Sequence, residues 1–176
     1  LKGNGSSKYL ETGVAMTFLG TNQLHMFVSF NPEVSEFRQL LAARANLAGA
    51  VALEDNYNGT TANRPRVSLF SGGFQPQNHC NPITGRTQYF INYTANAIEM
   101  YGRNIDLNNT NAPGAYSGTN NEAFLVFAGN QTGTGIIGHS GQRIDAYCFG
   151  AAFTTTAQRN DFHAAMSDFR TTLGRT

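Results

Sequence analysis

Residues 23–30, QLHMFVSF, have an apolar side chain at every second position: Leu24, Met26, Val28 and Phe30. A period of two puts these side chains on one side of an extended strand, whereas a helix would scatter them around its axis. The Asn31-Pro32 pair that follows ends the strand. A strand with one apolar face packs against a second layer, so this segment predicts a sheet with a buried side.

Similar short segments recur along most of the chain. Alternation and the turn residues between segments predict further strands at 8–14, 37–45, 48–55, 64–70, 88–93, 97–103, 122–128 and 142–153. The stretch 37–55 is also rich in Leu and Ala, which favour helix, and we interpret it as two strands. The segment 142–153 is apolar on both faces, which predicts a central strand. Long polar loops are expected at 104–121 and 129–141.

The period changes near the end of the chain. Steps of four, three and four residues separate the members of a single apolar stripe: Phe162, Met166, Phe169 and Leu173. Thr154–Thr156 offer an N-cap, and Gly174 is a candidate C-cap. We predict one amphipathic helix at about 157–173, which covers an edge or one end of the strand layers.

The composition fits a loop-rich β protein. Asn, Gly, Thr and Ser together supply more than a third of the chain, while 13 Phe and 7 Tyr provide material for a core. The 176 residues suit a single domain over 1–176, with strands at about 8–153. We therefore predict an all-β fold: a two-sheet antiparallel sandwich closed by one C-terminal amphipathic helix.

Charge and hydropathy argue against two classes of partner. Charged residues make up 13% of the chain, the net charge is +1, and Lys and Arg form no run, so nucleic-acid binding is not expected. No stretch approaches the length of an apolar membrane span, so membrane insertion is not expected either. The opening LKGNGSSKYL has neither an initiator Met nor the apolar region of a signal peptide. We interpret the chain as a domain of a longer polypeptide, and it could form a homo-oligomer through that parent protein.

The two cysteines, Cys80 and Cys148, form no CxxC motif. We interpret them as buried free thiols, and a disulfide between neighbouring strands remains the alternative.

Both ends of the chain resemble a known family. The opening LKGNGSSKYLETG and the closing RIDAYCFGAAFTTTAQRNDFHAAMSDFRTTLGR are similar to the first strand and the last strand-plus-helix of concanavalin-like, laminin-G-like domains of bacteriophage and bacterial surface proteins. The resemblance implies a jelly-roll sandwich of the kind found in tail fibres, spikes and capsid decorations. Such domains commonly bind glycans, sometimes with calcium. Both blocks are scaffold signals and contain no catalytic motif.

Catalytic acids of glucanases on this fold follow an E-x-D-x-x-E pattern, which puts the carboxylates on one side of a strand. The chain contains no such pattern, so we expect no enzyme of that type. A polysaccharide depolymerase or lyase remains a second alternative. It would use His79 or His139 as the base, with Arg86 or Arg103 neutralising a uronate. His25 and His163 are expected to be structural, and Ser140 lies in no nucleophile elbow.

Sugar recognition needs aromatic faces together with planar amide and charged groups that hydrogen-bond hydroxyls. Such residues gather around the 104–121 loop, and the predicted glycan-binding set is Tyr101, Arg103, Asn104, Tyr116, Asn120 and Asn121. Within the same loop, Asp106 and Asn108 are a weak candidate for Ca²⁺, because one carboxylate among Asn residues supplies few oxygen ligands. Asn-rich turn chemistry is the alternative explanation for this composition.

These observations favour a non-catalytic glycan-binding module that recognises a host-surface polysaccharide or another glycan. The expected location is the virion surface, with an extracellular or cell-surface position as the alternative. The first competing hypothesis is a structural virion component, a capsid decoration or fibre-attachment domain, that contacts other virion proteins and binds no sugar. Loops that bind sugar and loops that bind protein share one composition, so the sequence leaves both open.

Overall fold

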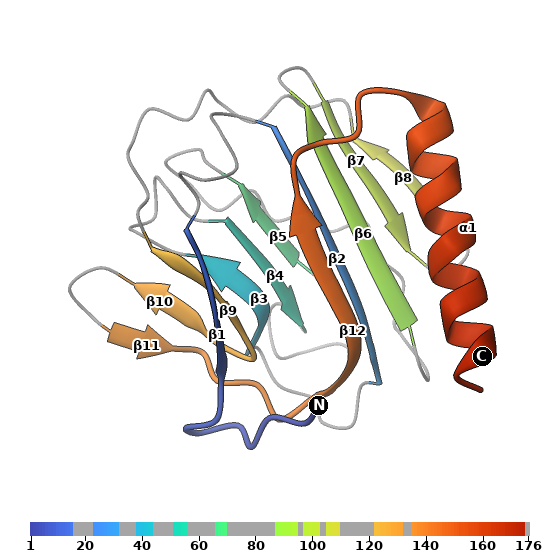
Figure 1. Cartoon of the computed structure of the whole chain (residues 1–176). Helices are drawn as coiled ribbons and strands as arrows, with labels where there is room; N and C mark the ends of the chain where they lie inside the picture. Colours follow the sequence, from blue (N-terminus) through green and yellow to red (C-terminus); the bar gives the residue numbers. More distant parts are fainter. Residues whose placement is uncertain are drawn as a thin grey trace.

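The computed structural model describes residues 1–15, 23–31, 38–43, 51–55, 66–69, 87–94, 97–102, 105–109, 122–131 and 135–174. All paired strands in this part of the chain are antiparallel. One five-stranded sheet has the order β1 (Leu10–Ala15), β9 (Ala123–Val126), β3 (Arg38–Ala43), β4 (Val51–Asp55) and β5 (Arg66–Leu69). The other has the order β12 (Arg143–Gly150), β2 (Leu24–Asn31), β6 (Thr87–Thr94), β7 (Ala97–Gly102) and β8 (Ile105–Asn109). A hairpin of β10 (Gly129–Gln131) and β11 (Gly135–Ile137) and the helix α1 (Thr156–Thr172) complete the elements (Figure 1).

The two five-stranded sheets contribute to one hydrophobic core. The apolar face predicted for β2 is confirmed, since all four of its alternate residues are buried. They pack in the same cluster as side chains of β3, β4, β6 and β9: Leu41, Val51, Leu53, Tyr89, Ile91, Tyr93, Phe124 and Val126. In β2 the period of two thus identifies the side chains that enter this core, and burial of their apolar area is a main source of its stability.

The other face of the β2 sheet is covered by α1, as Figure 1 shows beside β6 and β8. Phe162 of the helix lies 5.6 Å from the ring of Phe27 and 5.2 Å from that of Phe90, measured between ring centroids. The helix begins with a capping box in which the Thr155 hydroxyl accepts from Gln158 N–H at 3.2 Å and the Gln158 side chain accepts from Thr155 N–H at 3.2 Å. The predicted helix is confirmed and begins and ends one residue earlier than expected.

The prediction that 142–153 forms a central strand is wrong. Among the described strands β12 lies at the edge of its sheet, with β2 on one side. On the other side its first residues pair with the N-terminal segment, through a bridge between Lys2 and Arg143. Its two apolar faces have another cause: Tyr147 and Phe149 pack against the core, and α1 lies over the opposite face. A helix on the outer face imposes the same pattern as a position inside the sheet.

Two expected loops are partly strands. Residues 105–109 form β8, which pairs with β7, and the 129–141 segment contains the β10–β11 hairpin. Both strands of the hairpin are three residues long, which is too short to show a period. In β8, Ile105 and Leu107 do alternate with Asp106 and Asn108, but this alternation covers only the start of an Asn-rich stretch that we interpreted as a loop. The two strands predicted within 37–55 and the two predicted at 88–93 and 97–103 are confirmed as β3, β4, β6 and β7.

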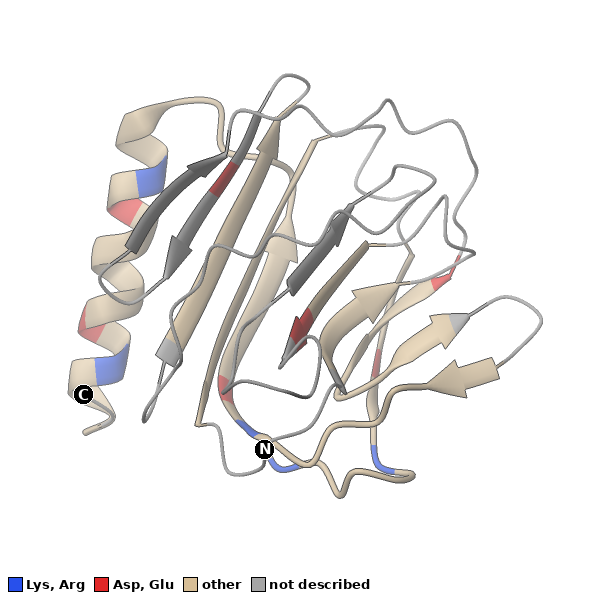
Figure 2. Ribbon diagram, turned by 180° about the vertical axis from the view of Figure 1, so that it is seen from behind, with Lys and Arg blue, Asp and Glu red and all other residues tan. Residues whose placement is uncertain are grey.

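Charged side chains of the described part are scattered singly over α1 and both sheets, as Figure 2 shows. Glu54 is fully buried on β4, and its Oε1 lies 3.5 Å from Nε2 of Gln39, the residue opposite it on β3. Neither the length nor the apolarity of α1 reaches what a membrane-crossing helix requires, and the rest of the described chain contains no other candidate span.

Candidate functional site

The β7–β8 ladder brings three of the predicted site residues together. Tyr101 on β7 is the register partner of Asp106 on β8, and Asn108 is the partner of Glu99. Residues directly opposite each other in an antiparallel ladder share a face of the sheet, so these four positions form two adjacent cross-strand pairs on one face. The other predicted residues lie outside the described part of the chain: Arg103, Asn104, Tyr116, Asn120 and Asn121.

Asn92 on β6 is the register partner of Glu99, so it extends the Asn108–Glu99 pair onto a third strand. Its side chain is fully buried, and its Nδ2 donates to Glu99 Oε2 at 2.9 Å and to the Phe153 carbonyl at 3.0 Å. Its Oδ1 accepts from Phe153 N–H at 2.8 Å. A buried amide is stable only with such partners, so Asn92 ties β6 to the segment that leads from β12 into α1.

Arg159, in the first turns of α1, contacts this group of polar side chains. Nε of Arg159 lies 3.2 Å from Glu99 Oε2, and its Nη2 donates to the Thr156 hydroxyl at 2.9 Å. We call Asn92, Glu99 and Arg159 the polar cluster. Its amide, carboxylate and guanidinium are planar groups with fixed directions, the type of group that recognises hydroxyls and carboxylates. The side chains of Arg159 and Glu99 retain 13% and 22% of their exposure, so the cluster reaches the surface.

His163 lies next to the polar cluster on α1. Its ring meets the edge of Phe90 with the centroids 4.8 Å apart. Burial lowers the pKa of His163, because a low-dielectric surrounding disfavours the imidazolium. The imidazole is therefore neutral at pH 7 and adds no positive charge beside Arg159.

The calcium prediction rested on a coordinating loop, and the first part of that loop is a strand. In β8, Asp106 and Asn108 are held two residues apart in an extended ladder. Ca²⁺ takes six to eight oxygen ligands, usually from a loop that curves around it. In the described part of the chain no three His, Cys, Asp or Glu residues are grouped so that they could hold a metal ion. A role for Asp106 and Asn108 in binding calcium stays a prediction.

His25 and Cys148 form a second group of titratable side chains, beneath α1. His25 Nδ1 donates to the Ala151 carbonyl at 2.6 Å, and its Nε2 lies 3.9 Å from Cys148 Sγ. Its ring stacks on Phe153 at a centroid distance of 4.5 Å. Burial lowers the pKa of His25 more than the bond to Ala151 raises it, and burial raises the pKa of Cys148 to about 11.

This arrangement differs from that of a catalytic thiol, whose pKa is depressed so that the thiolate forms at neutral pH. Cys148 is instead a free thiol, as predicted, but it is half-buried where we predicted full burial. The stacked His25 fills space between the sheet and the helix. Cys80 lies outside the described residues. This packing agrees with the expectation that His25 is a structural residue.

The residues proposed for a lyase are only partly described. His139 is half-buried, and its ring lies 6.1 Å from that of Tyr9. The neighbouring Ser140 is fully buried and acts as a turn residue, since its hydroxyl accepts from Gln142 N–H at 3.1 Å. His79, Arg86 and Arg103 lie outside the described part.

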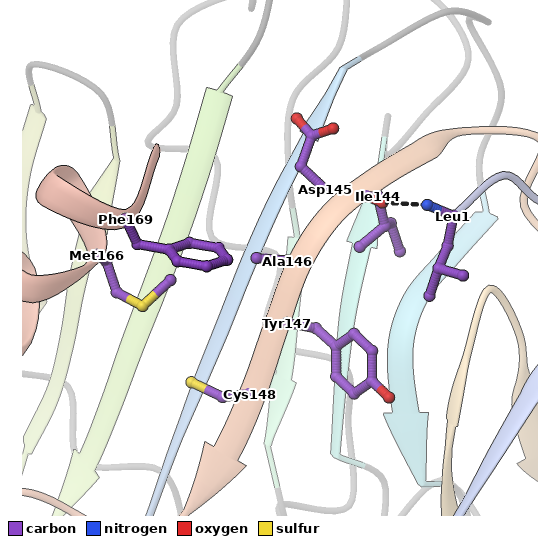
Figure 3. Close-up of a pocket in the computed structure, with 8 residues that line it drawn as sticks. All are labelled: Leu1, Ile144, Asp145, Ala146, Tyr147, Cys148, Met166 and Phe169. Carbon is purple, nitrogen blue, oxygen red and sulfur yellow. Dashed lines mark hydrogen bonds between the residues drawn. The ribbon is translucent and has the colours of Figure 1, made fainter. Parts of the chain in front are cut away.

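A groove of about 480 Å³ runs along the free edge of β12, beside the C-terminal half of α1 (Figure 3). Its lining is mainly apolar and comes from three segments: Leu1, Ile144, Asp145, Ala146, Tyr147, Cys148, Met166 and Phe169. Sequence reasoning missed this groove, because it depends on the path of the N-terminal segment past β12. It also missed the polar cluster, whose one visible signal was a polar residue, Asn92, inside an apolar strand.

Comparison with known proteins adds no assignment to this geometry. Neither the known protein-family models nor the curated protein sequences match this chain.

Proposed function

We propose that this chain is a non-catalytic glycan-binding module with a concanavalin-like jelly-roll sandwich fold, acting in host-surface recognition on a virion or cell surface. The observation that carries the proposal is the set of polar and aromatic positions that the β7–β8 ladder places beside Glu99. The Glu99 carboxylate is 22% exposed and is held in place by the buried Asn92 amide, and the ladder aligns Tyr101 and Asp106 with it. A fixed set of donors and acceptors next to a Tyr position is the usual means of binding a sugar.

The jelly-roll part of the proposal draws support from two independent sources. The two ends of the sequence resemble the ends of concanavalin-like domains, and the described strands form antiparallel sheets followed by a C-terminal helix. Five of the six predicted glycan-binding residues come after Gly102 in β7, in or beside the 104–121 region. The proposal therefore joins this region to the polar cluster as one binding surface.

A structural role in a virion, without sugar binding, is favoured by a different observation. Within the described ranges, five large apolar residues are 40% or more exposed: Leu1, Tyr9, Leu10, Phe169 and Leu173. Exposed apolar side chains that gather in patches mark protein contacts more often than sugar sites. In this alternative, the domain attaches to another virion protein through these side chains.

Calorimetry with purified host-surface polysaccharide, with and without calcium, tests the proposal. We expect saturable binding to a ligand that keeps its length, and a loss of at least about tenfold in affinity for Tyr101→Ala. Tyr9→Ala is the matched control, because Tyr9 is 43% exposed and lies in the N-terminal segment. Absence of binding would favour the structural role, and shortening of the polysaccharide would show a depolymerase.

A further inference from the structure

An imidazole and a thiol face each other beneath α1, on neighbouring strands of one sheet. His25 lies on β2 and Cys148 on β12, and Nε2 of the imidazole is 3.9 Å from Sγ of the thiol. The register pairs Cys148 with Phe27, two residues from His25, so the two side chains share one face of the sheet. Neither belongs to the polar cluster.

The hydrogen bond on the other side of the ring shows which nitrogen of His25 carries the proton. Nδ1 lies 2.6 Å from the carbonyl oxygen of Ala151, which can only accept, so Nδ1 bears the hydrogen. Burial lowers the pKa of His25, so the imidazole is neutral at pH 7 and Nε2 keeps a free lone pair. Histidines that bind metals regularly donate their second nitrogen to a carbonyl in this way.

Neighbouring groups hold the imidazole in this orientation. Phe153 stacks on it with the centroids 4.5 Å and the planes 15° apart, and the rings of Phe162 and Phe90 lie at 5.8 Å and 6.2 Å. Gly150, directly opposite His25 on β12, leaves room for the ring, since a Cβ added there would lie 2.8 Å from His25 Cε1. The imidazole is therefore positioned in advance of any ligand, which lowers the entropic cost of binding one.

The distance between the nitrogen and the sulfur suits a bridging metal ion. Bonds of about 2.3 Å to sulfur and about 2.0 Å to nitrogen place the two ligand atoms roughly 3.5 to 4.3 Å apart, as the angle at the metal opens from tetrahedral to linear. The observed 3.9 Å falls within this range, so the two side chains can hold one ion with little movement. A thiol is a weak donor, so a direct hydrogen bond at this distance contributes little.

The number and chemistry of the ligands select the class of ion. Within the described ranges no third His, Cys, Asp or Glu joins the pair, whereas Zn²⁺ takes at least three ligands from the protein. Thiolate and imidazole, with the Met166 thioether lining the groove beside Cys148 (Figure 3), are ligands that favour Cu(I). Burial raises the pKa of Cys148 to about 11, so a thiolate here needs a neutralising charge. A monovalent ion leaves the pair neutral, and a divalent ion would leave a net charge in apolar surroundings.

We propose that His25 Nε2 and Cys148 Sγ bind one soft monovalent metal ion, Cu(I), between the sheet and α1. On binding, the S–H bond of Cys148 breaks and a bond from its sulfur to copper forms. The proton passes to the solvent, and neither copper nor sulfur changes its oxidation state. The ion enters by the groove, because Cys148 is half-buried and lines it.

Titration with Cu(I) without oxygen, in competition with a colorimetric chelator, tests this site. The starting protein is Cys80→Ser, which removes the other thiol of the chain. We expect it to bind one Cu(I) per chain and Cys148→Ser in the same background to lose the ion. His25→Gln should bind at least about tenfold more weakly, a loss that even an outer-shell change can cause. His163→Gln is the matched control and should bind as the starting protein does, since that imidazole also packs on Phe90 and Phe162.

X-ray absorption of the copper-loaded Cys80→Ser chain gives a readout that leaves His25 and Cys148 unchanged. It should show one nitrogen together with sulfur on each ion. Three results would overturn the proposal: no Cu(I) retained by Cys80→Ser, equal affinity of a folded His25→Gln and the starting protein, or sulfur ligation without nitrogen. The last two would show that the thiol captures copper without the imidazole.

Discussion

The two halves of α1 carry the same apolar stripe and meet different surroundings. In the N-terminal half, Phe162 contacts five aromatic rings, and Arg159 pairs with Glu99. In the C-terminal half, Phe169 and Leu173 are 47% and 45% exposed. Periodicity therefore identifies the side of a helix that faces a sheet, while the width of the sheet beneath it decides how much of that side is buried. The first half of α1 packs on β2 and β6, and the second half borders the groove at β12.

Substitution of the two phenylalanines should separate the two halves most clearly. We expect Phe162→Ala to lower the free energy of unfolding by about 3 kcal/mol, because it removes a ring packed among other rings. Phe169→Ala should cost less than about 1 kcal/mol, since that ring is already half in water. Urea denaturation of both variants checks this. Equal losses would mean that the helix docks along its full length.

Asn92 tests whether hydrogen bonds fix the N-terminal half. We expect Asn92→Ala to cost about 2 kcal/mol, because the Phe153 N–H and carbonyl lose their buried partner. Asn160→Ala on the exposed side of α1 is the control and should change stability by less than about 0.5 kcal/mol. If both variants unfold at the same urea concentration, the polar cluster does not hold the helix.

Acid should loosen the same half of the helix. Burial lowers the pKa of His25 and of His163 below the value of 6.5 that we take for the unfolded chain, so the unfolded state binds protons more readily. Their contribution to stability is complete above pH 6.5 and is lost as the pH falls from there toward the folded-state pKa values. Urea midpoints between pH 7.5 and pH 5 measure this loss. The double variant His25→Gln and His163→Gln should show a flatter dependence over that interval, and an unchanged slope would point to other groups.

The smallest expected effect concerns Cys148 on β12, which lines the groove together with Met166 and Phe169 of α1. Burial raises its pKa to about 11 from the unperturbed value of 9.0, so the thiolate is scarce at pH 8. Alkylation by iodoacetamide should therefore be slower in the folded chain than in urea, with peptide mass spectrometry to separate Cys148 from Cys80. Labelling as fast as in the unfolded chain would contradict the burial of this thiol.

The sequence predicted those features of the fold that depend on local pattern. β2 and α1 were found because a period of two and a helical stripe are visible in adjacent residues. The position of β12 in its sheet was missed, since cover by a helix and cover by a neighbouring strand demand the same apolar side chains. β8 was missed because its alternation of Ile105 and Leu107 with polar residues is short and lies at the start of an Asn-rich stretch typical of loops.

The candidate site was predictable only in its composition. The sequence indicated Tyr101, Asp106 and Asn108 as polar or aromatic groups near one segment, and the register with β7 now aligns them. Asn92 acts on Phe153, 61 positions further along the chain, and no local pattern reveals such a pairing. The β12 groove likewise arises from the meeting of residue 1 with residue 144.

The neighbours of β12 have a consequence for synthesis on the ribosome. β12 pairs with β2 and with the first residues of the chain, which leave the ribosome well over a hundred residues earlier. During translation, the edge of β2 and the Leu1–Gly3 segment stay unpaired with β12 until residue 150 has emerged. The sheet thus closes late, and a nascent chain must keep the hydrogen-bonding edge of β2 from pairing with other chains in the meantime.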